Sequence, residues 1–240
     1  IVTIISDLNI EVISHWSTKN NLIHIDTQDF YQHIDSKVND LEIVARTHLP
    51  IKNTNNCDFV VFRSKNNFYE YFCLLIGKAR SINKKNKIDI VPTVRIHSQC
   101  ITGDLLHSLK CDCGEQLHNA INLMSKKNEG ILIYLSQEGR NIGLTNKLRS
   151  YILQDQGLDT VDANLTLGFE EDERSYYAAK HILDLLNVDK IKLITNNPDK
   201  IKQLESLGIS IVERIPSITK TNKFNKDYII AKKNRTEHYL

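Results

Sequence analysis

The order of hydrophobic and polar residues predicts strands in the first half of the chain. Two apolar runs rich in aromatic and β-branched residues, 58–64 and 68–77, are separated by a Lys-Asn-Asn turn sequence, which predicts an antiparallel hairpin. A polar, basic loop is expected over 78–87, before another strand-like run over 88–97. Residues 1–42 form an N-terminal extension, in which a strand or a short helix is indicated by Ile4, Ile5, Leu8, Ile10, Val12 and Ile13.

Later in the chain, apolar residues recur every three to four positions, as on one face of a helix. A first helix is predicted around 117–124, with Gly130 closing it before a buried strand over 131–135. A second helix is predicted around 144–152 and is ended by Gly157.

The same alternation continues toward the C-terminus. A third helix is predicted over 173–187, followed by a strand over 190–195. Asn197 is expected to cap a fourth helix that stops before Gly208, and a strand over 209–213 follows. This order predicts an α/β fold: a layered α/β core with a mixed sheet, in which N-terminal β-hairpins are added to alternating strand-helix units.

Composition narrows the class of protein. With 240 residues, 41% hydrophobic and 25% charged, the chain has the composition of a folded globular protein. A net charge of +2 is too small for a protein whose main task is neutralising a nucleic-acid backbone. No run reaches the roughly 20 apolar residues that span a bilayer. We therefore expect a cytoplasmic protein with no nucleic-acid or membrane partner.

Basic residues are unevenly distributed. The chain uses 22 Lys and 9 Arg, yet residues 95–174 hold four of each. Arginine retained in a lysine-rich chain indicates bidentate contacts that lysine does not make. Residues 190–240 carry 11 basic and 5 acidic side chains, which fits either a solvated face or the edge of an anionic substrate site.

Three of the five cysteines fall close together: ten residues separate Cys100 from Cys111, and one separates Cys111 from Cys113. In a reducing compartment this spacing favours metal ligands over disulfides. Cys57 and Cys73, in or beside the hairpin, are expected to pack in the core.

The spacing leaves three alternatives for the cluster. It is a closed structural zinc site completed by His97 or His107, an open catalytic site with water in the fourth position, or a group of free core cysteines. The segment 137–143 (QEGRNIG) follows a strand and opens a helix, where backbone N–H groups favour an anion, although taken alone the glycine pair favours a plain turn. The charged run 170–174 fits a helix start.

Four segments in order closely resemble GTP cyclohydrolase II of riboflavin biosynthesis: 95–117 (RIHSQCITGDLLHSLKCDCGEQL), 134–169 (YLSQEGRNIGLTNKLRSYILQDQGLDTVDANLTLGF), 172–174 (DER) and 193–200 (LITNNPDK). The resemblance covers 43–216. It extends more loosely into the tail through Asn225, Tyr228, Lys232 and His238.

The resemblance implies a hydrolase that opens the imidazole ring of GTP at carbon 8. Formate and diphosphate are released, and the product is 2,5-diamino-6-(5-phospho-ribosylamino)pyrimidin-4(3H)-one. It also implies a homodimer and three regions, namely the extension 1–42, a catalytic domain over 43–216 and a basic tail over 217–240.

By the same resemblance, one zinc ion per subunit is held by Cys100, Cys111 and Cys113, with water as the fourth ligand, and Mg²⁺ accompanies the triphosphate. Asp172 matches the proton acceptor. Arg174 matches a residue proposed as nucleophile on the α-phosphate, although a protonated guanidinium suits an electrostatic clamp. Tyr151 matches a tyrosine linked to the second hydrolysis, so a fully deformylated product is expected.

The resemblance also assigns a set of GTP-binding residues. Cationic members suit the triphosphate, Gln116 and Glu138 suit the edges of guanine, and the threonines bond phosphate or base. Gln99 departs from the glutamate of many family members, and a basic insert over 84–87 is a second departure. The complete set is Arg95, Ile96, His97, Ser98, Gln99, Gln116, Glu138, Gly139, Arg140, Thr160, Thr195 and Lys200.

Two other functions stay open at this point. One is a non-catalytic zinc- or nucleotide-binding relative, and the other is an enzyme that stops at the formylated pyrimidine. A fused dihydroxybutanone phosphate synthase is not expected in 1–42, because the acidic motif of that enzyme is absent there.

Overall fold

A computed structural model describes residues 10–23, 41–65, 70–82, 90–235 and 239. The chain divides into two compact units, 1–37 and 38–240. In the first unit, Ile10–Lys19 form helix α1, so this segment is the predicted short helix and not a strand. Ile4, Ile5 and Leu8 lie outside the described residues. None of the helices described has the length and apolar character needed to cross a membrane.

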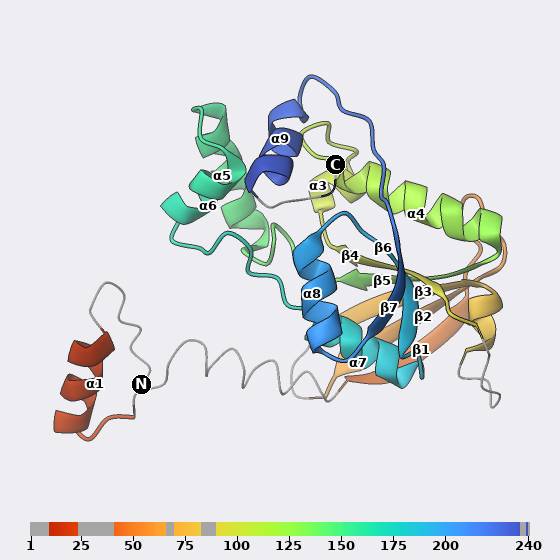
Figure 1. The fold of residues 1–240 in the computed structure, drawn as a ribbon, viewed down its shortest axis with the longest axis horizontal. Coiled ribbons are helices and arrows are strands. Elements are labelled where there is room, and N and C mark those ends of the chain that lie inside the picture. The colour runs from red at the N-terminus through yellow and green to blue at the C-terminus, as the bar shows by residue number, and fades with distance from the viewer. Residues whose placement is uncertain (1–9, 24–40, 66–69, 83–89, 236–238, 240) are drawn as a thin grey trace. The chain divides into compact units, whose positions relative to one another are not determined.

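The second unit is built on one seven-stranded mixed sheet (Figure 1). Its spatial order is β1-β2-β3-β5-β4-β6-β7, with antiparallel pairing from β1 to β5 and parallel pairing from β5 to β7. The predicted hairpin is confirmed as β2 and β3. The strands are β1 (Leu41–His48), β2 (Cys57–Ser64), β3 (Glu70–Gly77), β4 (Thr93–Ser98), β5 (Glu129–Leu135), β6 (Lys190–Ile194) and β7 (Ser210–Ile215).

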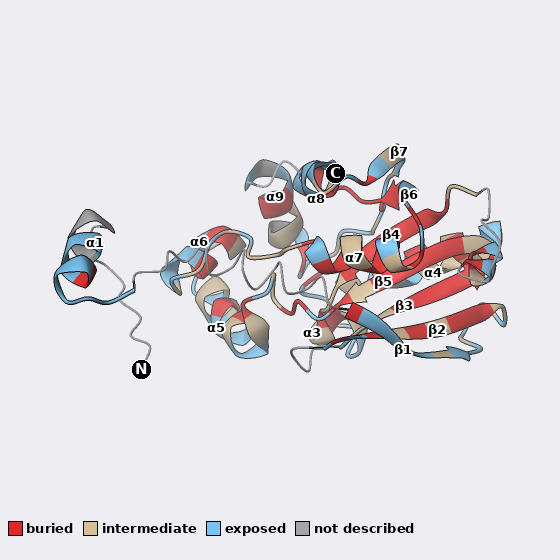
Figure 2. Ribbon diagram, turned by 90° about the horizontal axis from the view of Figure 1, so that it is seen from below, coloured by how far each residue is buried: buried red, intermediate tan, exposed pale blue. Residues whose placement is uncertain are grey.

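Helices cover both faces of this sheet, so the predicted layered α/β core is confirmed (Figure 1). Helix α7 buries Ala179, Ile182 and Leu183 on one face, and α4 buries Ala120 and Met124 on the other. Figure 2 shows the buried central strands between them. The helices of this unit are η2 (Lys78–Ser81, a 3-10 turn), α3 (Ile101–Asp104), α4 (Cys113–Lys127), α5 (Gly143–Asp155), α6 (Thr160–Thr166), α7 (Tyr177–Leu185), α8 (Pro198–Ser206) and α9 (Lys226–Arg235).

Gly130 does not close the first predicted helix. Asn128 takes the left-handed conformation at the end of α4 (φ 48°), and Gly130 is already part of β5. Its hydrogen side chain is required by packing, because a β-carbon there would lie 2.3 Å from Cγ of Met124. The prediction was wrong because asparagine also tolerates positive φ, and the glycine serves the close approach of helix and strand.

The third predicted helix was placed too early. Residues 172–176 form no regular secondary structure and α7 begins at Tyr177, so the charged run 170–174 is not a helix start. Three short α-helices were missed, α3, α6 and α9, and so was strand β1. Helix α6 carries a readable signal, because the Asp159 side chain accepts hydrogen bonds from the first-turn N–H groups of Val161 and Asp162.

The predicted ends of the second and fourth helices agree with the structure, whereas the strand predicted over 88–97 is β4, in which residues 90–92 take no part. Gly157 (φ 105°) follows the end of α5, and the Asn197 side chain caps α8 as predicted, accepting from two backbone N–H groups. Of the expected loop 78–87, the first residues form the η2 turn, and the basic insert 84–87 lies outside the described residues.

The connections around β4 define where a site forms. The chain leaves β4, covers one face with α4, and enters β5 on one side of β4; it then covers the opposite face with α7 and enters β6 on the other side. At such a switch point the two crossovers diverge and leave a crevice at the carboxyl ends of the parallel strands. A ligand site is expected just after Ser98, Leu135 and Ile194.

Replacing Gly130 by alanine is expected to lower the free energy of unfolding by about 1–3 kcal/mol, because the new methyl overpacks against Met124. Urea unfolding measures the loss. The control compares G130A, M124A and the double variant. The double variant should lose less unfolding free energy than the sum of the two single variants. Additive losses would mean that the two residues do not share this contact.

Candidate active site

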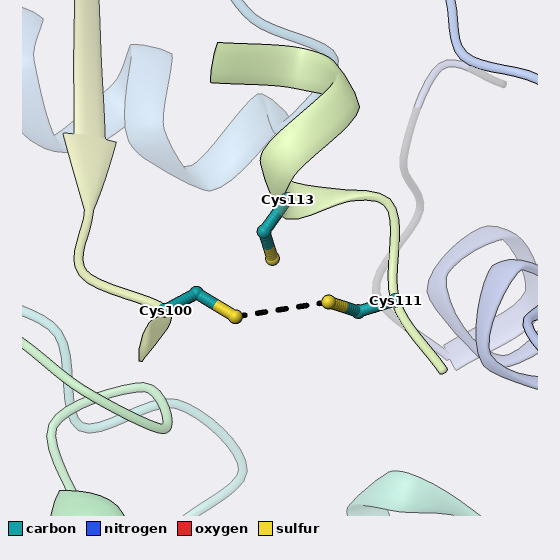
Figure 3. A group of neighbouring side chains, drawn as sticks. All are labelled: Cys100, Cys111 and Cys113. Atoms are coloured by element: carbon teal, nitrogen blue, oxygen red, sulfur yellow. Dashed lines mark hydrogen bonds between the residues drawn. The ribbon is translucent and has the colours of Figure 1, made fainter. Parts of the chain in front are cut away.

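Three cysteine sulfurs meet where α3 and α4 begin. Cys100 follows β4, Cys111 lies in the intervening loop, and Cys113 is the first residue of α4, so three backbone segments aim their thiols at one point (Figure 3). The sulfurs of Cys100 and Cys111 are 3.7 Å apart, and all three lie within 4.8 Å of one another. The arrangement brings together the residues that the sequence spacing singled out.

The geometry of these sulfurs fits a tetrahedral zinc ion. A Zn–S bond of about 2.3 Å in a tetrahedron separates two sulfurs by roughly 3.8 Å, close to the distance between Cys100 and Cys111. In the part of the chain that the structure describes, the cluster has no fourth protein ligand. Nε2 of His97 instead lies 3.1 Å from both carboxylate oxygens of Asp104, and the His107 ring lies against His118. The residues present fit the open alternative.

Close backbone packing holds the cluster. A β-carbon on Gly103 would lie 2.8 Å from Sγ of Cys111, so only glycine lets α3 approach the thiols. The Asp104 carboxylate accepts a hydrogen bond from the backbone N–H of Cys100 at 3.0 Å. It also accepts from the Tyr134 hydroxyl at 2.9 Å. The turn after β4 is therefore fixed before any ligand binds.

The three thiols share their protons unequally. Contacts with the Cys111 and Cys113 thiols, outweighing burial and aided by the Lys147 ammonium, place the pKa of Cys100 far below its usual value. The bond to Cys100 raises the pKa of Cys111 to about 11, and the pKa of Cys113 is raised as well. One sulfur is thus a thiolate from the start, as a metal cradle requires.

The other two cysteines behave as core residues. Cys57 and Cys73 are completely buried in β2 and β3. Burial raises the pKa of Cys57 to about 11 and that of Cys73 further. Both thiols stay protonated, and the prediction that they pack in the core is confirmed.

A pocket opens beside the thiol cluster and is lined by cationic side chains. Nζ of Lys200 donates to the carbonyl oxygen of Ile96 at 2.8 Å and lies 5.2 Å from the Tyr176 ring centroid. Burial and the nearby Arg95 and Arg174 lower the pKa of Lys200 well below its usual value. No carboxylate among the described residues pairs with this ammonium, so an incoming anion would be strongly stabilised.

The two charged residues of the DER segment hold each other. The Arg174 guanidinium binds both carboxylate oxygens of Asp172 and lines the pocket. Burial would raise the pKa of Asp172, but Arg174 outweighs it and the pKa lies below its usual value. Beside this pair, Arg140 donates to the carbonyl of Glu171 at 2.9 Å.

The side chains of Gln116 and Glu138 are already engaged inside the protein. Gln116 accepts from Arg95 at 2.5 Å and donates to Asp112 at 2.7 Å. Glu138 accepts from the backbone of Ile101 at 2.7 Å and forms a buried ion pair with a lysine of α5. In this arrangement both side chains support the pocket wall.

The structure brings almost all sequence-predicted residues to one pocket. Ile96 is the exception among the GTP-binding set, since its side chain is in the core and only its carbonyl meets Lys200. Asp172 reaches the site through its pair with Arg174. The predicted residues that line the pocket are Arg95, His97, Ser98, Gln99, Cys100, Cys111, Cys113, Gln116, Glu138, Gly139, Arg140, Tyr151, Thr160, Arg174, Thr195 and Lys200.

Sequence reasoning missed the full contribution of the C-terminal tail. Tyr228 and Lys232, one turn apart on α9, both line the pocket. Nζ of Lys232 is 2.6 Å from the carboxylate of Asp112, a fully buried side chain between two of the clustered cysteines. The loose resemblance in the tail named these two residues, and their spacing of four was the available signal. The Asn225 side chain accepts a hydrogen bond from the backbone N–H of Asn222, just before this helix, and His238 lies outside the described residues.

Lys147, in the middle of α5, was also missed. Its ammonium lies 2.6 Å from Glu138 and 3.1 Å from Sγ of Cys100. The available signal was its place one helical turn before Tyr151. The other pocket-lining residues that were missed lie on the same helices and loops as the predicted ones. They are Gln137, Ile142, Ser150, Gln154, Asn164, Asn196 and Asn197.

Replacing Lys232 by methionine is expected to lower the free energy of unfolding by about 3–5 kcal/mol at pH 7, because Asp112 is left as an uncompensated buried carboxylate. Urea unfolding of the metal-free protein measures the loss. K232M/D112N removes both charges and should recover part of it. An equal loss in both variants would contradict this explanation.

The same ion pair has a defined pH dependence. Burial would raise the pKa of Asp112, but Lys232 and Gln116 outweigh it, and the pKa lies below its usual value. Stability from the pair is therefore present at every pH above about 3.9, the unfolded value, and is lost as the pH falls through the lower folded value.

Comparisons with known proteins agree with this site. The family whose model matches the chain is GTP cyclohydrolase II, over residues 42–216. A "GTP cyclohydrolase-2" of Azospirillum brasilense is 40% identical over 226 residues; the match covers 94% of this chain and 57% of that protein. A "GTP cyclohydrolase-2" of Haemophilus influenzae (strain PittGG) is 40% identical over 200 residues, covering 83% of this chain and 89% of that protein.

One solved structure is also similar, RibBX, a two domain 3,4-dihydroxy-2-butanone 4-phosphate synthase from A. baumannii. Its TM-score is 0.47 at 16% identity, covering 89% of this chain and 50% of that chain. The family match and the Haemophilus relative each span most of the region that builds the pocket. By these two matches the chain belongs to the GTP cyclohydrolase II family of enzymes.

Proposed function

We propose that this chain hydrolyses GTP with the help of zinc, opening the imidazole ring at carbon 8 and releasing formate and diphosphate. The product is 2,5-diamino-6-(5-phospho-ribosylamino)pyrimidin-4(3H)-one, the first intermediate of riboflavin biosynthesis. One observation carries the proposal: a three-thiol metal cradle faces the same pocket as Arg95 and Lys200, two buried cations that form no ion pair with a carboxylate among the described residues. Such a pocket accepts a polyanion on one side and an electrophilic carbon on the other.

Cys100, Cys111 and Cys113 would hold the zinc ion, since the first two sulfurs are 3.7 Å apart and all three lie within 4.8 Å of one another. When bound with an open fourth position, zinc supplies a Lewis acid that activates water for attack on the ring carbon. The described residues contain no carboxylate cluster for a second metal, so Mg²⁺ would arrive with the triphosphate.

The cations of the pocket would bind the triphosphate. Lys200 and Arg95 are buried and fixed by main-chain carbonyls, so they present positive charge without a large loss of side-chain entropy on binding. Arg174 gives bidentate contacts suited to a phosphoryl group. It acts as an electrostatic clamp on the α-phosphate, because a protonated guanidinium is a poor nucleophile.

The Asp172–Arg174 pair suggests how binding prepares a base. With Arg174 in place, the pKa of Asp172 is low and its carboxylate is a weak base. When Arg174 exchanges this carboxylate for phosphate oxygens, Asp172 loses its main cation and its pKa rises. Asp172 then accepts the proton released during ring opening.

Tyr151 would assist the second hydrolysis. Burial raises the pKa of Tyr151 to about 12, so it enters the reaction as a neutral phenol. A neutral phenol donates a hydrogen bond to the formamide oxygen or to the departing amine. Loss of the formyl group to water gives formate and the 5-amino product.

We further propose that 43–216 is the catalytic domain, that 1–42 is an extension, and that the tail 217–240 contributes to the pocket through α9. The family resemblance supports a homodimer. A cytoplasmic location fits the free thiols, which stay reduced there. In this proposal the protein has no nucleic-acid or membrane partner.

Incubating the zinc-loaded protein with GTP and Mg²⁺ is expected to release formate and diphosphate in equal amounts, with a pyrimidine mass that lacks the formyl group. Removing zinc with a chelator should abolish formate, and zinc should restore it. A product that keeps the formyl group would favour the variant that stops early. Zinc-replete protein that releases no formate would favour the non-catalytic alternative.

Replacing Arg174 by methionine is expected to lower kcat for diphosphate release by about 10²–10³, the effect of removing one preorganised charge from a transition state. R174K should lose less, because it keeps a point charge. R149M is the matched control, since Arg149 is exposed and its guanidinium donates to the Asn146 side chain on the same helix. An R174M rate near that of R149M would contradict the clamp.

A further inference from the structure

Lys147 is a buried ammonium in contact with the proposed metal site. Its side chain is 9% exposed, and its Nζ lies 3.1 Å from Sγ of Cys100 and 2.6 Å from the Glu138 carboxylate. The same Nζ lies 5.8 Å from the centroid of the Tyr151 ring. One cation thus touches a sulfur of the proposed metal site and lies near a proposed catalytic side chain.

Glu138 fixes this lysine to the metal loop. One carboxylate oxygen of Glu138 holds Nζ, and the other accepts from the backbone N–H of Ile101, the residue after Cys100, at 2.7 Å. The carboxylate also accepts from the N–H of Gly139 at 3.1 Å. Helix α5, the 137–143 loop and the turn after β4 are held together by this one buried pair.

The charge of the proposed centre gives the lysine a task. Three thiolates and one zinc ion sum to −1, and a buried net charge is costly unless a counter-charge lies nearby. Lys147 is the cation whose hydrogen bond reaches a sulfur in the described structure. Lys110 also lies near the Tyr151 ring, at 5.2 Å from its centroid, but pairs with Asp155 instead.

We propose that Lys147 is a positioning residue of the metal centre, whose ammonium compensates the excess thiolate charge through Cys100 while Glu138 holds it in place. The inference rests on the zinc site of the proposed function. A charge that stabilises the loaded site favours metal over protons at the three sulfurs. Outer-shell partners of this kind change metal affinity by about 10–100-fold when removed.

Metal titration tests the inference without turnover. Wild-type apoprotein and K147M are titrated with Zn²⁺ against a chromophoric chelator, and with Co²⁺ while the sulfur-to-cobalt charge-transfer absorption is recorded. K147M is expected to bind both ions about 10–100-fold more weakly. Its charge-transfer band should move to lower energy, because the Cys100 lone pairs lose a stabilising cation. K147R keeps the charge and should retain affinity and band position.

Two further variants separate charge compensation from simple support of the fold. K147M/E138Q removes both charges of the buried pair, so it folds without an orphan carboxylate; its metal affinity should stay low. K110M removes the other lysine near the Tyr151 ring and should bind metal like the wild type. Wild-type affinity and band energy in K147M, or recovery of both in K147M/E138Q, would overturn the inference. Failure of the wild type to bind either ion would instead overturn the zinc proposal.

Discussion

The position of β4 between two parallel neighbours is the constraint on which the site depends. Because the chain enters β5 on one side of β4 and β6 on the other, its crossovers leave on opposite faces and the crevice between them is not filled. Cys100 follows β4, the 137–143 loop follows β5, and Thr195 follows β6. Residues about a hundred positions apart in sequence therefore meet at one edge of a rigid sheet.

Around that edge, the protein keeps charges that do not fully cancel. Burial lowers the pKa of Lys200, and the nearby Arg95 and Arg174 lower it further. The proposed zinc centre would carry a net negative charge. Like charges held in a buried wall reduce stability unless a ligand of opposite sign arrives. Until such a ligand binds, the Asp172–Arg174 and Glu138–Lys147 ion pairs neutralise part of the positive charge of the pocket wall.

The C-terminal segment belongs to this site although the family match ends at residue 216. Asp112 sits between two clustered cysteines, and its buried carboxylate is paired by Lys232 of α9. The local excess of basic residues in the tail was compatible with either a solvated face or a substrate edge. The ion pair and the pocket lining exclude a solvated face for Lys232, while Lys223 and Lys226 stay exposed.

The sequence by itself determined the mixed α/β fold, the three metal-site cysteines and most of the pocket, because these depend on local periodicity and on motifs contiguous along the chain. The sequence could not assign Gly130, because its role is set by the contact with Met124 between a helix and a strand. It could not place the start of α7 either, because a charged run is compatible both with a helix start and with an irregular segment. Only the tertiary structure decided that Glu138 is paired with Lys147, that neither His97 nor His107 joins the cysteines, and that α9 closes one wall. These outcomes follow from which partner a side chain finds across the fold, and spacing along one chain does not encode that.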